Sequence, residues 1–155
     1  MNNKYVKYGG IAAVIILLLY SLISAFGFGS KPASLTNNSE SKIIIPTSSG
    51  SVVIPDVTKN PVEVSGDAVA VSETSNFHIV YNFSDKSFII TLLSLPLQKS
   101  RDAAEEEFLK KTSLSPGQAC QISVSVTVPF NVDETASGKN YGLSFCPASL
   151  ALPGN

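Results

Sequence analysis

Two cysteines, Cys120 and Cys146, are the residues of this sequence whose chemistry is easiest to interpret. They do not form a C-x-x-C pair, which is the spacing of redox-active thiols. They are also a poor basis for a metal site, because the chain contains only one histidine, His78. Outside the cytoplasm, paired cysteines form structural disulfides. We therefore predict a Cys120–Cys146 bridge.

The residue sets of the common catalytic sites are missing from the sequence. His78 is the single candidate for a histidine general base, and it lies mid-strand, on the face opposite Phe77 and Ile79. The sequence contains no G-x-S-x-G, H-E-x-x-H, G-x-G-x-x-G or P-loop motif. We therefore predict no enzymatic activity, no catalytic residue, no metal and no cofactor.

Carboxylates supply one alternative to this prediction. Asp133 and Glu134 lie in a polar loop, and together with Asp85 they define the hypothesis of a carboxylate-dependent hydrolase acting on envelope polymers. The same pair with Asp85 or Asp102 would make a calcium site, although the loop lacks the D-x-D-x-D-G spacing of calcium loops.

Arg101 lies beside the apolar stripe of a predicted helix, between Leu97 and Ala104. Two interpretations stay open. Arg101 is either an edge residue that pairs with Glu105, four positions later, or it holds a carboxylate of another strand or of a partner. The acidic run 105–107 fans out around the helix axis and is expected to be a solvated face.

The loop 131–140 is the segment where we expect contacts with a partner, because long polar loops on a rigid framework often carry binding residues. An ordinary surface loop is the alternative. The candidate contact residues are Arg101, Asp133, Glu134 and Lys139.

The elements that position these residues begin with an apolar segment at residues 9–28, GGIAAVIILLLYSLISAFGF. It contains no charge and no proline, and at about 1.5 Å per residue such a helix crosses the roughly 30 Å of bilayer hydrocarbon. Lys4 and Lys7 precede it. The positive-inside rule therefore predicts a single-pass helix in the cell membrane, with residues 1–8 in the cytoplasm and the remaining chain outside.

Two other interpretations of this segment stay open. A signal peptide cut at the small residues Ala25 and Gly27 is one. A pilin-type leader cut after residue 9 or 10 is the other, but the fifth mature position then holds Val14 or Ile15, where pilins carry glutamate. All three interpretations place the following residues beyond the membrane.

Composition limits the partners. The 155 residues carry a formal net charge of −1, and the part after the apolar segment is mildly acidic. This argues against nucleic acid, which needs a basic footprint, and against a polybasic surface for anionic lipid. The expected partners are the lipid bilayer, through residues 9–28, and an envelope protein or polymer.

The rest of the chain divides into four parts. Residues 29–42 are a polar, flexible linker. Residues 43–76 are a β-rich lead-in of short apolar runs, in which Pro46 and Pro55 either restrict the strands to edge positions or end them. Residues 77–147 are the main domain, and the tail 148–155 carries no structural signal.

Within 77–147 the hydrophobic periodicity predicts four strands and one main helix. Strand, strand, helix, strand, strand is the order of an α+β domain with an antiparallel sheet and one helix packed on it. Pairing of the last two strands would place the disulfide at the base of a hairpin. We expect strands at 77–83, 88–93, 120–128 and 141–146, the helix at 97–111, and a capped helical turn at 114–120 with Ser115 as N-cap, Pro116 at N1 and Gln118 at N3.

Four short patterns recur in one kind of protein: F-I-I-x-L from Phe88, R-x-x-A-E from Arg101, A-C at Ala119–Cys120, and G-L-S-F-C-P from Gly142 to Pro147. In these patterns the segment 88–147 resembles uncharacterised single-pass extracytoplasmic envelope proteins of small-genome bacteria. The resemblance covers under half of the chain. It implies an anchor, a paired cysteine and an outside location, and it carries no activity and no site residue.

Together these features predict a membrane-anchored extracytoplasmic protein whose small disulfide-linked domain binds an envelope protein or polymer. A pilin-like subunit of a surface appendage and a carboxylate-dependent envelope hydrolase are the two alternatives.

Overall fold

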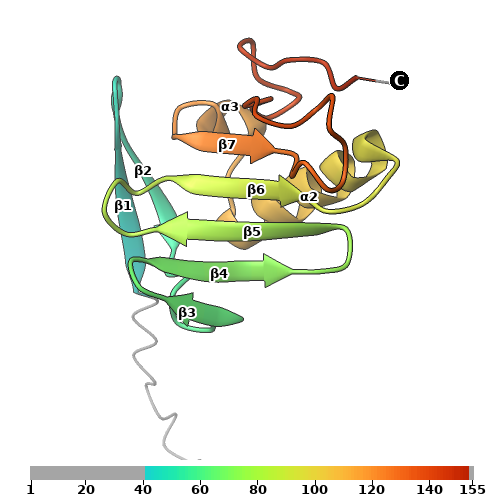
Figure 1. Cartoon of the computed structure of the whole chain (residues 1–155). Coiled ribbons are helices and arrows are strands. Elements are labelled where there is room, and N and C mark those ends of the chain that lie inside the picture. Colours follow the sequence, from blue (N-terminus) through green and yellow to red (C-terminus); the bar gives the residue numbers. More distant parts are fainter. Residues whose placement is uncertain (1–40, 154–155) are drawn as a thin grey trace, which may run out of the picture. The chain divides into compact units, whose positions relative to one another are not determined.

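A computed structural model describes residues 41–153 (Figure 1). The predicted transmembrane helix at 9–28 and nearly all of the predicted linker lie outside these residues. None of the helices within 41–153 has the length and apolar character needed to cross a membrane. The described residues belong to one compact unit.

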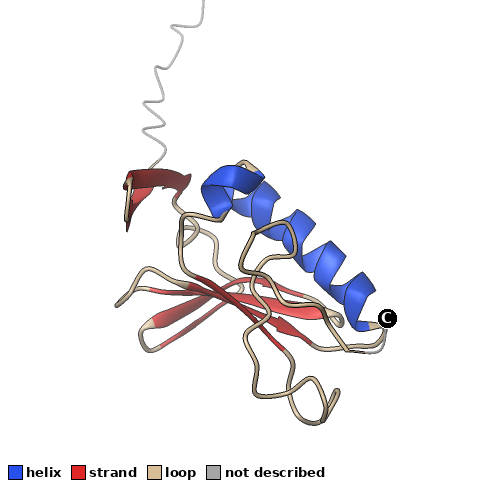
Figure 2. Ribbon diagram, turned by 90° about the horizontal axis from the view of Figure 1, so that it is seen from above, coloured by secondary structure: helices blue, strands red, loops and turns tan. Residues whose placement is uncertain are grey.

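The unit is α+β, with two sheets and one main helix. Five strands form the larger sheet in the order β3-β4-β5-β6-β7, and β1 and β2 form a separate hairpin. Helix α2 covers one face of the larger sheet (Figure 2). The elements are β1 Lys42–Thr47, β2 Gly50–Pro55, β3 Glu63–Ser65, β4 Ala68–Glu73, β5 Phe77–Asn82, β6 Phe88–Leu92, α2 Leu97–Thr112, α3 Pro116–Ala119 and β7 Val124–Thr127.

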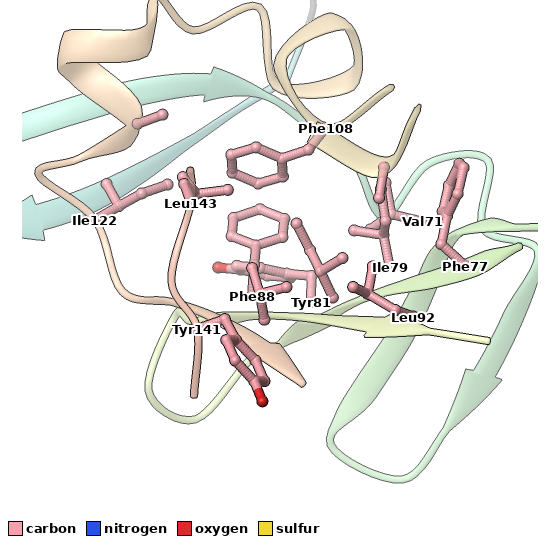
Figure 3. Close-up of a cluster of buried hydrophobic side chains, with 14 of the residues drawn as sticks. Val71, Phe77, Ile79, Tyr81, Phe88, Leu92, Phe108, Ile122, Tyr141 and Leu143 are labelled. Atoms are coloured by element: carbon pink, nitrogen blue, oxygen red, sulfur yellow. The ribbon is translucent and has the colours of Figure 1, made fainter. Parts of the chain in front are cut away.

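The hairpin of β5 and β6 and the helix α2 confirm the predictions for this part of the chain. Apolar residues at helical spacing place Leu97, Ala104 and Phe108 in the core, as expected. The ring of Phe108 meets that of Phe88 edge-on at 5.1 Å between centroids, and the ring of Phe88 lies 5.0 Å from that of Tyr81 (Figure 3). Aromatic pairs of this geometry stabilise a core beyond the area that they bury.

The sheet is mixed, so the predicted purely antiparallel arrangement is wrong for β7. Strands β3 to β6 pair antiparallel, but β7 runs parallel to β6, with Phe88 opposite Val124 and Thr91 opposite Thr127. The physical reason is the helix between them. A strand that returns to the sheet through a helical crossover arrives parallel to the strand it left.

The predicted final strand at 141–146 is also wrong. Tyr141 N donates to Val126 O at 2.8 Å, but Val126 N donates to the Asn140 side chain, so no regular ladder forms. Gly142 follows with φ +60°, a left-handed conformation that turns the chain away from β7. The disulfide therefore does not close a two-stranded hairpin.

The predicted lead-in, residues 43–76, supplies core residues as well as an edge strand. β3 is an edge strand of the larger sheet, but β4 lies between β3 and β5, and its Val69 and Val71 are in the core. β1 and β2 pair only with each other, and Ile45, Val52 and Ile54 on their inner face join the same core.

The capped helical turn before Cys120 is α3, and its capping matches the prediction residue by residue. The hydroxyl of Ser115 accepts from Gln118 N, and the side chain of Gln118 accepts from Ser115 N at 3.0 Å. Pro116 stands at the start of the helix, where its missing N–H costs nothing.

Ser113 ends α2 in the left-handed conformation, with φ 55° and ψ 28°. A residue with a Cβ is strained there, and glycine is not. We expect Ser113→Gly to raise the free energy of unfolding by about 0.5–1 kcal/mol. Urea denaturation followed by circular dichroism measures the change. Ser113→Ala keeps the strain and should give no gain; an equal gain from both variants would contradict this explanation.

Candidate functional site

Arg101 lies inside the domain and not at its edge. Its side chain is 3% exposed, and its Nε donates to Glu105 Oε1 at 2.9 Å. The remaining guanidinium nitrogens donate to backbone carbonyls of the C-terminal segment: Leu150 O at 3.0 Å, Gly142 O at 2.7 Å and Tyr141 O at 3.2 Å. The pairing with Glu105 is therefore confirmed, but the guanidinium is buried in contacts within the chain and is not accessible to a partner.

Glu105 completes this buried cluster. Its carboxylate accepts from Ser144 N at 2.6 Å and from the Ser144 hydroxyl. The predicted solvated face at 105–107 is therefore wrong for Glu105, which is buried because Arg101 and Ser144 satisfy its charge and hydrogen bonds. The cluster fastens segment 141–150 to α2, which gives it a structural role.

The disulfide Cys120–Cys146 fastens the same segment to the end of α3 and confirms the prediction, with its Cα atoms 5.5 Å apart. An open hollow of about 210 Å³ lies beside it. Small-molecule pockets usually measure roughly 300–1,000 Å³, so this hollow does not suit a cofactor. Its walls include Ala119, Cys120, Ile122, Asn140, Leu143 and Cys146.

The loop after β7 is folded around Asp133. Asp133 Oδ1 accepts from Thr135 N at 2.8 Å, from the Thr135 hydroxyl at 2.7 Å and from Ala136 N at 3.0 Å. These hydrogen bonds, led by that of the Thr135 hydroxyl, favour the charged form and hold the pKa of the Asp133 carboxyl below its usual 3.8. Asp133 therefore stabilises the fold of the loop itself, and its contact with a partner stays a prediction.

Tyr141 holds the far end of the loop. Its side chain is buried and points away from Phe108 (Figure 3), and its hydroxyl donates to Ala136 O at 2.8 Å. Burial also raises the pKa of the Tyr141 hydroxyl. Because Ala136 is itself fully buried, the loop is packed onto the domain at its middle as well as at its ends.

Phe130 is the residue of this loop that the sequence prediction missed. It is 66% exposed, the highest value among the large apolar side chains of residues 41–153. Glu134 and Lys139, which the sequence did single out, are also exposed. The sequence signal for Phe130 was an aromatic residue at the start of an otherwise polar loop. We call residues 129–140 the Phe130 loop and take it as the candidate contact site.

The structure does not bring the carboxylates of the hydrolase or calcium hypotheses together. Asp85 Oδ1 accepts from Ser87 N and the Ser87 hydroxyl in the turn before β6, whereas Asp133 follows β7. Because β6 and β7 are parallel, these positions lie at opposite ends of the sheet. Within residues 41–153, no group of three or more His, Cys, Asp or Glu side chains could hold a metal.

His78 lies on β5, but as its second residue and not in the middle as predicted, with Glu73 and Thr91 as its cross-strand neighbours. Its Nε2 is buried and has no hydrogen-bond partner within the described part of the chain. A triad requires the histidine to bond both a nucleophile and a carboxylate, and this arrangement is not seen here.

Comparison with family models, with curated proteins and with solved structures found no match for this chain. The site therefore has to be interpreted from its own geometry. That geometry defines a small disulfide-linked α+β domain that carries a fixed loop with an exposed aromatic side chain.

The lowered pKa of Asp133 makes a prediction for stability against pH. A carboxyl whose pKa is lower in the folded state stabilises the fold fully above its unfolded pKa, and this contribution disappears as the pH falls through the folded pKa. We expect Asp133→Asn to be less stable than the wild type near pH 7, with the difference closing as the pH falls from about 4 through the lowered pKa of the folded state. Urea midpoints from pH 2 to 7 measure it.

The matched control is Glu134→Gln, which removes the neighbouring exposed carboxylate. Its urea midpoint should follow that of the wild type across the same range. A constant gap between Asp133→Asn and the wild type at every pH would contradict the assigned hydrogen bonds.

Proposed function

We propose that this chain is a membrane-anchored extracytoplasmic protein whose disulfide-linked domain binds a protein or polymer of the cell envelope through the Phe130 loop. The apolar segment 9–28 supports the anchor, since its length and lack of charge suit a bilayer. The disulfide supports an oxidising location outside the cytoplasm, where such bonds persist.

The observation that carries the binding role is an exposed aromatic side chain on a loop that is already fixed. Aromatic residues dominate the binding energy of protein interfaces, because they bury a large rigid surface. A loop held by Asp133 and Tyr141 loses little conformational entropy when a partner binds. Phe130 on this loop is thus positioned as an anchor residue.

The charges on the same loop as Phe130 favour a protein partner among the envelope components. Glu134 and Lys139 are exposed and opposite in sign, so the loop offers a polar rim of mixed charge along with the exposed aromatic ring. This is the general layout of protein interfaces, in which a polar rim surrounds an apolar core. A highly charged polymer of one sign would meet one unfavourable charge at this rim.

Photo-crosslinking in intact cells tests the proposal. A photoreactive phenylalanine analogue replaces Phe130 in the full chain, and mass spectrometry identifies the adducts. Val64 is a matched control position, because it is 63% exposed but lies on β3, at the other edge of the sheet. A specific adduct from position 130 supports the proposal. The same adducts in the same yield from both positions, or no adduct from position 130, would count against it.

Phe130→Ala is expected to weaken the captured complex about 30-fold or more, because truncation of an aromatic anchor costs about 2 kcal/mol or more. The side chain is mostly solvent-exposed, so the free energy of unfolding should change by less than about 0.5 kcal/mol. Titration with the partner identified by crosslinking measures the first effect and urea denaturation the second. Unchanged affinity in a folded variant would refute the role of Phe130.

A further inference from the structure

The hairpin β1–β2 is apolar on both faces, and only one face is covered. Its register pairs Ile44 with Val53 on the outer face, where they are 58% and 51% exposed. On the inner face, Ile45, Val52 and Ile54 point into the core. The complete outer face consists of Lys42, Ile44, Pro46, Ser51, Val53 and Pro55.

Two lysines flank this outer face, and it carries no acidic side chain. Lys42 lies at one end, and Lys86 reaches over from the turn between β5 and β6 to donate to Ile44 O at 3.1 Å. The nearest acid along the strand, Asp56, accepts from the Ser41 and Thr58 hydroxyls. An apolar surface edged with positive charge is complementary to lipid acyl chains beneath a layer of phosphates.

Other occupants fit this face less well. An added strand needs free N–H and C=O groups at a sheet edge, but Pro46 and Pro55 have no N–H, and Lys86 occupies the carbonyl of Ile44. A second copy of the chain would need an interface of roughly 20–30 residues a side, whereas this face offers six residues.

This inference rests on the proposed function, in which residues 9–28 are the membrane anchor. The chain between that anchor and β1 is short, and it therefore keeps the hairpin near the bilayer. Only residues 29–41 separate that segment from Lys42. A chain of this length reaches at most about 45 Å even when it is fully extended. The hairpin is thus the part of the domain closest along the chain to the membrane surface.

We propose that the outer face of the β1–β2 hairpin lies on the outer surface of the bilayer. Ile44, Pro46 and Val53 then enter the boundary between headgroups and acyl chains, and Lys42 and Lys86 meet lipid phosphates. Lys86 fixes the hairpin to the end of the sheet where β6 begins, whereas the Phe130 loop follows the opposite end, where β7 stops (Figure 1). This contact would therefore point the Phe130 loop away from the membrane.

Depth measurement on the full chain in vesicles tests the proposal. Val53→Cys is labelled with an environment-sensitive fluorophore, which is selective because the structure records no free cysteine among the described residues. Lys139→Cys in the Phe130 loop is the matched exposed control. We expect lipid-borne quenchers to reach the label at position 53 at a depth of roughly 5–10 Å, and the label at position 139 to stay in water.

The lysines give a second readout. Vesicles of phosphatidylcholine with phosphatidylglycerol should draw the label at position 53 into lipid more than phosphatidylcholine alone. Lys42→Gln and Lys86→Gln should each reduce the lipid-facing population about five-fold on the anionic vesicles. An equal response to both lipid mixtures would overturn the assignment of the lysines to phosphates.

The remaining outcomes separate this inference from the proposed function. If the chain does not float with vesicles at all, the proposed anchor fails, and this inference with it. If it floats but the label at position 53 stays in water, only the hairpin contact is overturned. Shielding of position 53 that disappears when the number of protein copies per vesicle is lowered would assign the face to a second copy and overturn the lipid contact.

Discussion

Arg101→Met is expected to lower the free energy of unfolding by about 3–5 kcal/mol. The substitution leaves the Glu105 carboxylate buried without its cation, and it leaves the carbonyls of Tyr141, Gly142 and Leu150 without a shared donor. Methionine has a similar length and apolar character, so loss of packing contributes little. Urea denaturation of the purified full chain in detergent, followed by circular dichroism, measures the loss.

Two further variants isolate the cause. Arg101→Met combined with Glu105→Met should be less destabilised than the sum of the single changes, because removing both charges leaves no unpaired buried ion. Lys110→Met breaks the exposed pair with Glu107, whose N···O distance is 3.4 Å, and should cost less than about 1 kcal/mol. Equal costs for the buried and exposed pairs would refute the role assigned to Arg101.

Loss of the Cys120–Cys146 disulfide is expected to cost about 3.5 kcal/mol in the chain-entropy model. The cysteines are 26 residues apart, so the bond closes a loop of moderate length and restricts the unfolded chain. Cys120→Ser combined with Cys146→Ser should reproduce the effect of a reducing agent on the wild type. Thermal and urea unfolding with and without reductant measure it.

The location of the bond gives a sharper form of this prediction. The disulfide and Arg101 both hold segment 141–150, one from α3 and the other from α2. Two restraints on one segment are not independent, so the combined loss should differ from the sum of the separate losses. Strict additivity, or an unchanged urea midpoint after reduction, would contradict the view that this segment is an integral part of the fold.

Elements that local sequence determines were predictable. The alternation in β5, the apolar spacing in α2 and the capping residues of α3 all depend on neighbours within a few positions. The cysteine pairing followed from there being only two. The direction of β7 was not predictable from its own alternation, because that pattern fixes which face is buried and not which strand lies beside it.

The site was predictable only in part, for a related reason. The sequence placed Arg101 beside the helix stripe, but its carbonyl partners lie about 40 residues away and belong to no periodic element. Glu105 was expected in solvent because Ser144, its partner from the C-terminal segment, could not be seen in the helix sequence. Phe130 stood out only when its exposure on a fixed loop was known.

We have proposed that a membrane-held chain presents its disulfide-linked domain in an oxidising space outside the cytoplasm. Fractionation of intact cells, with thiol alkylation before and after reduction, tests it most directly. We expect the chain in the membrane fraction, with Cys120 and Cys146 reacting only after reduction. A chain in the cytosolic fraction with both thiols reactive from the start would contradict it.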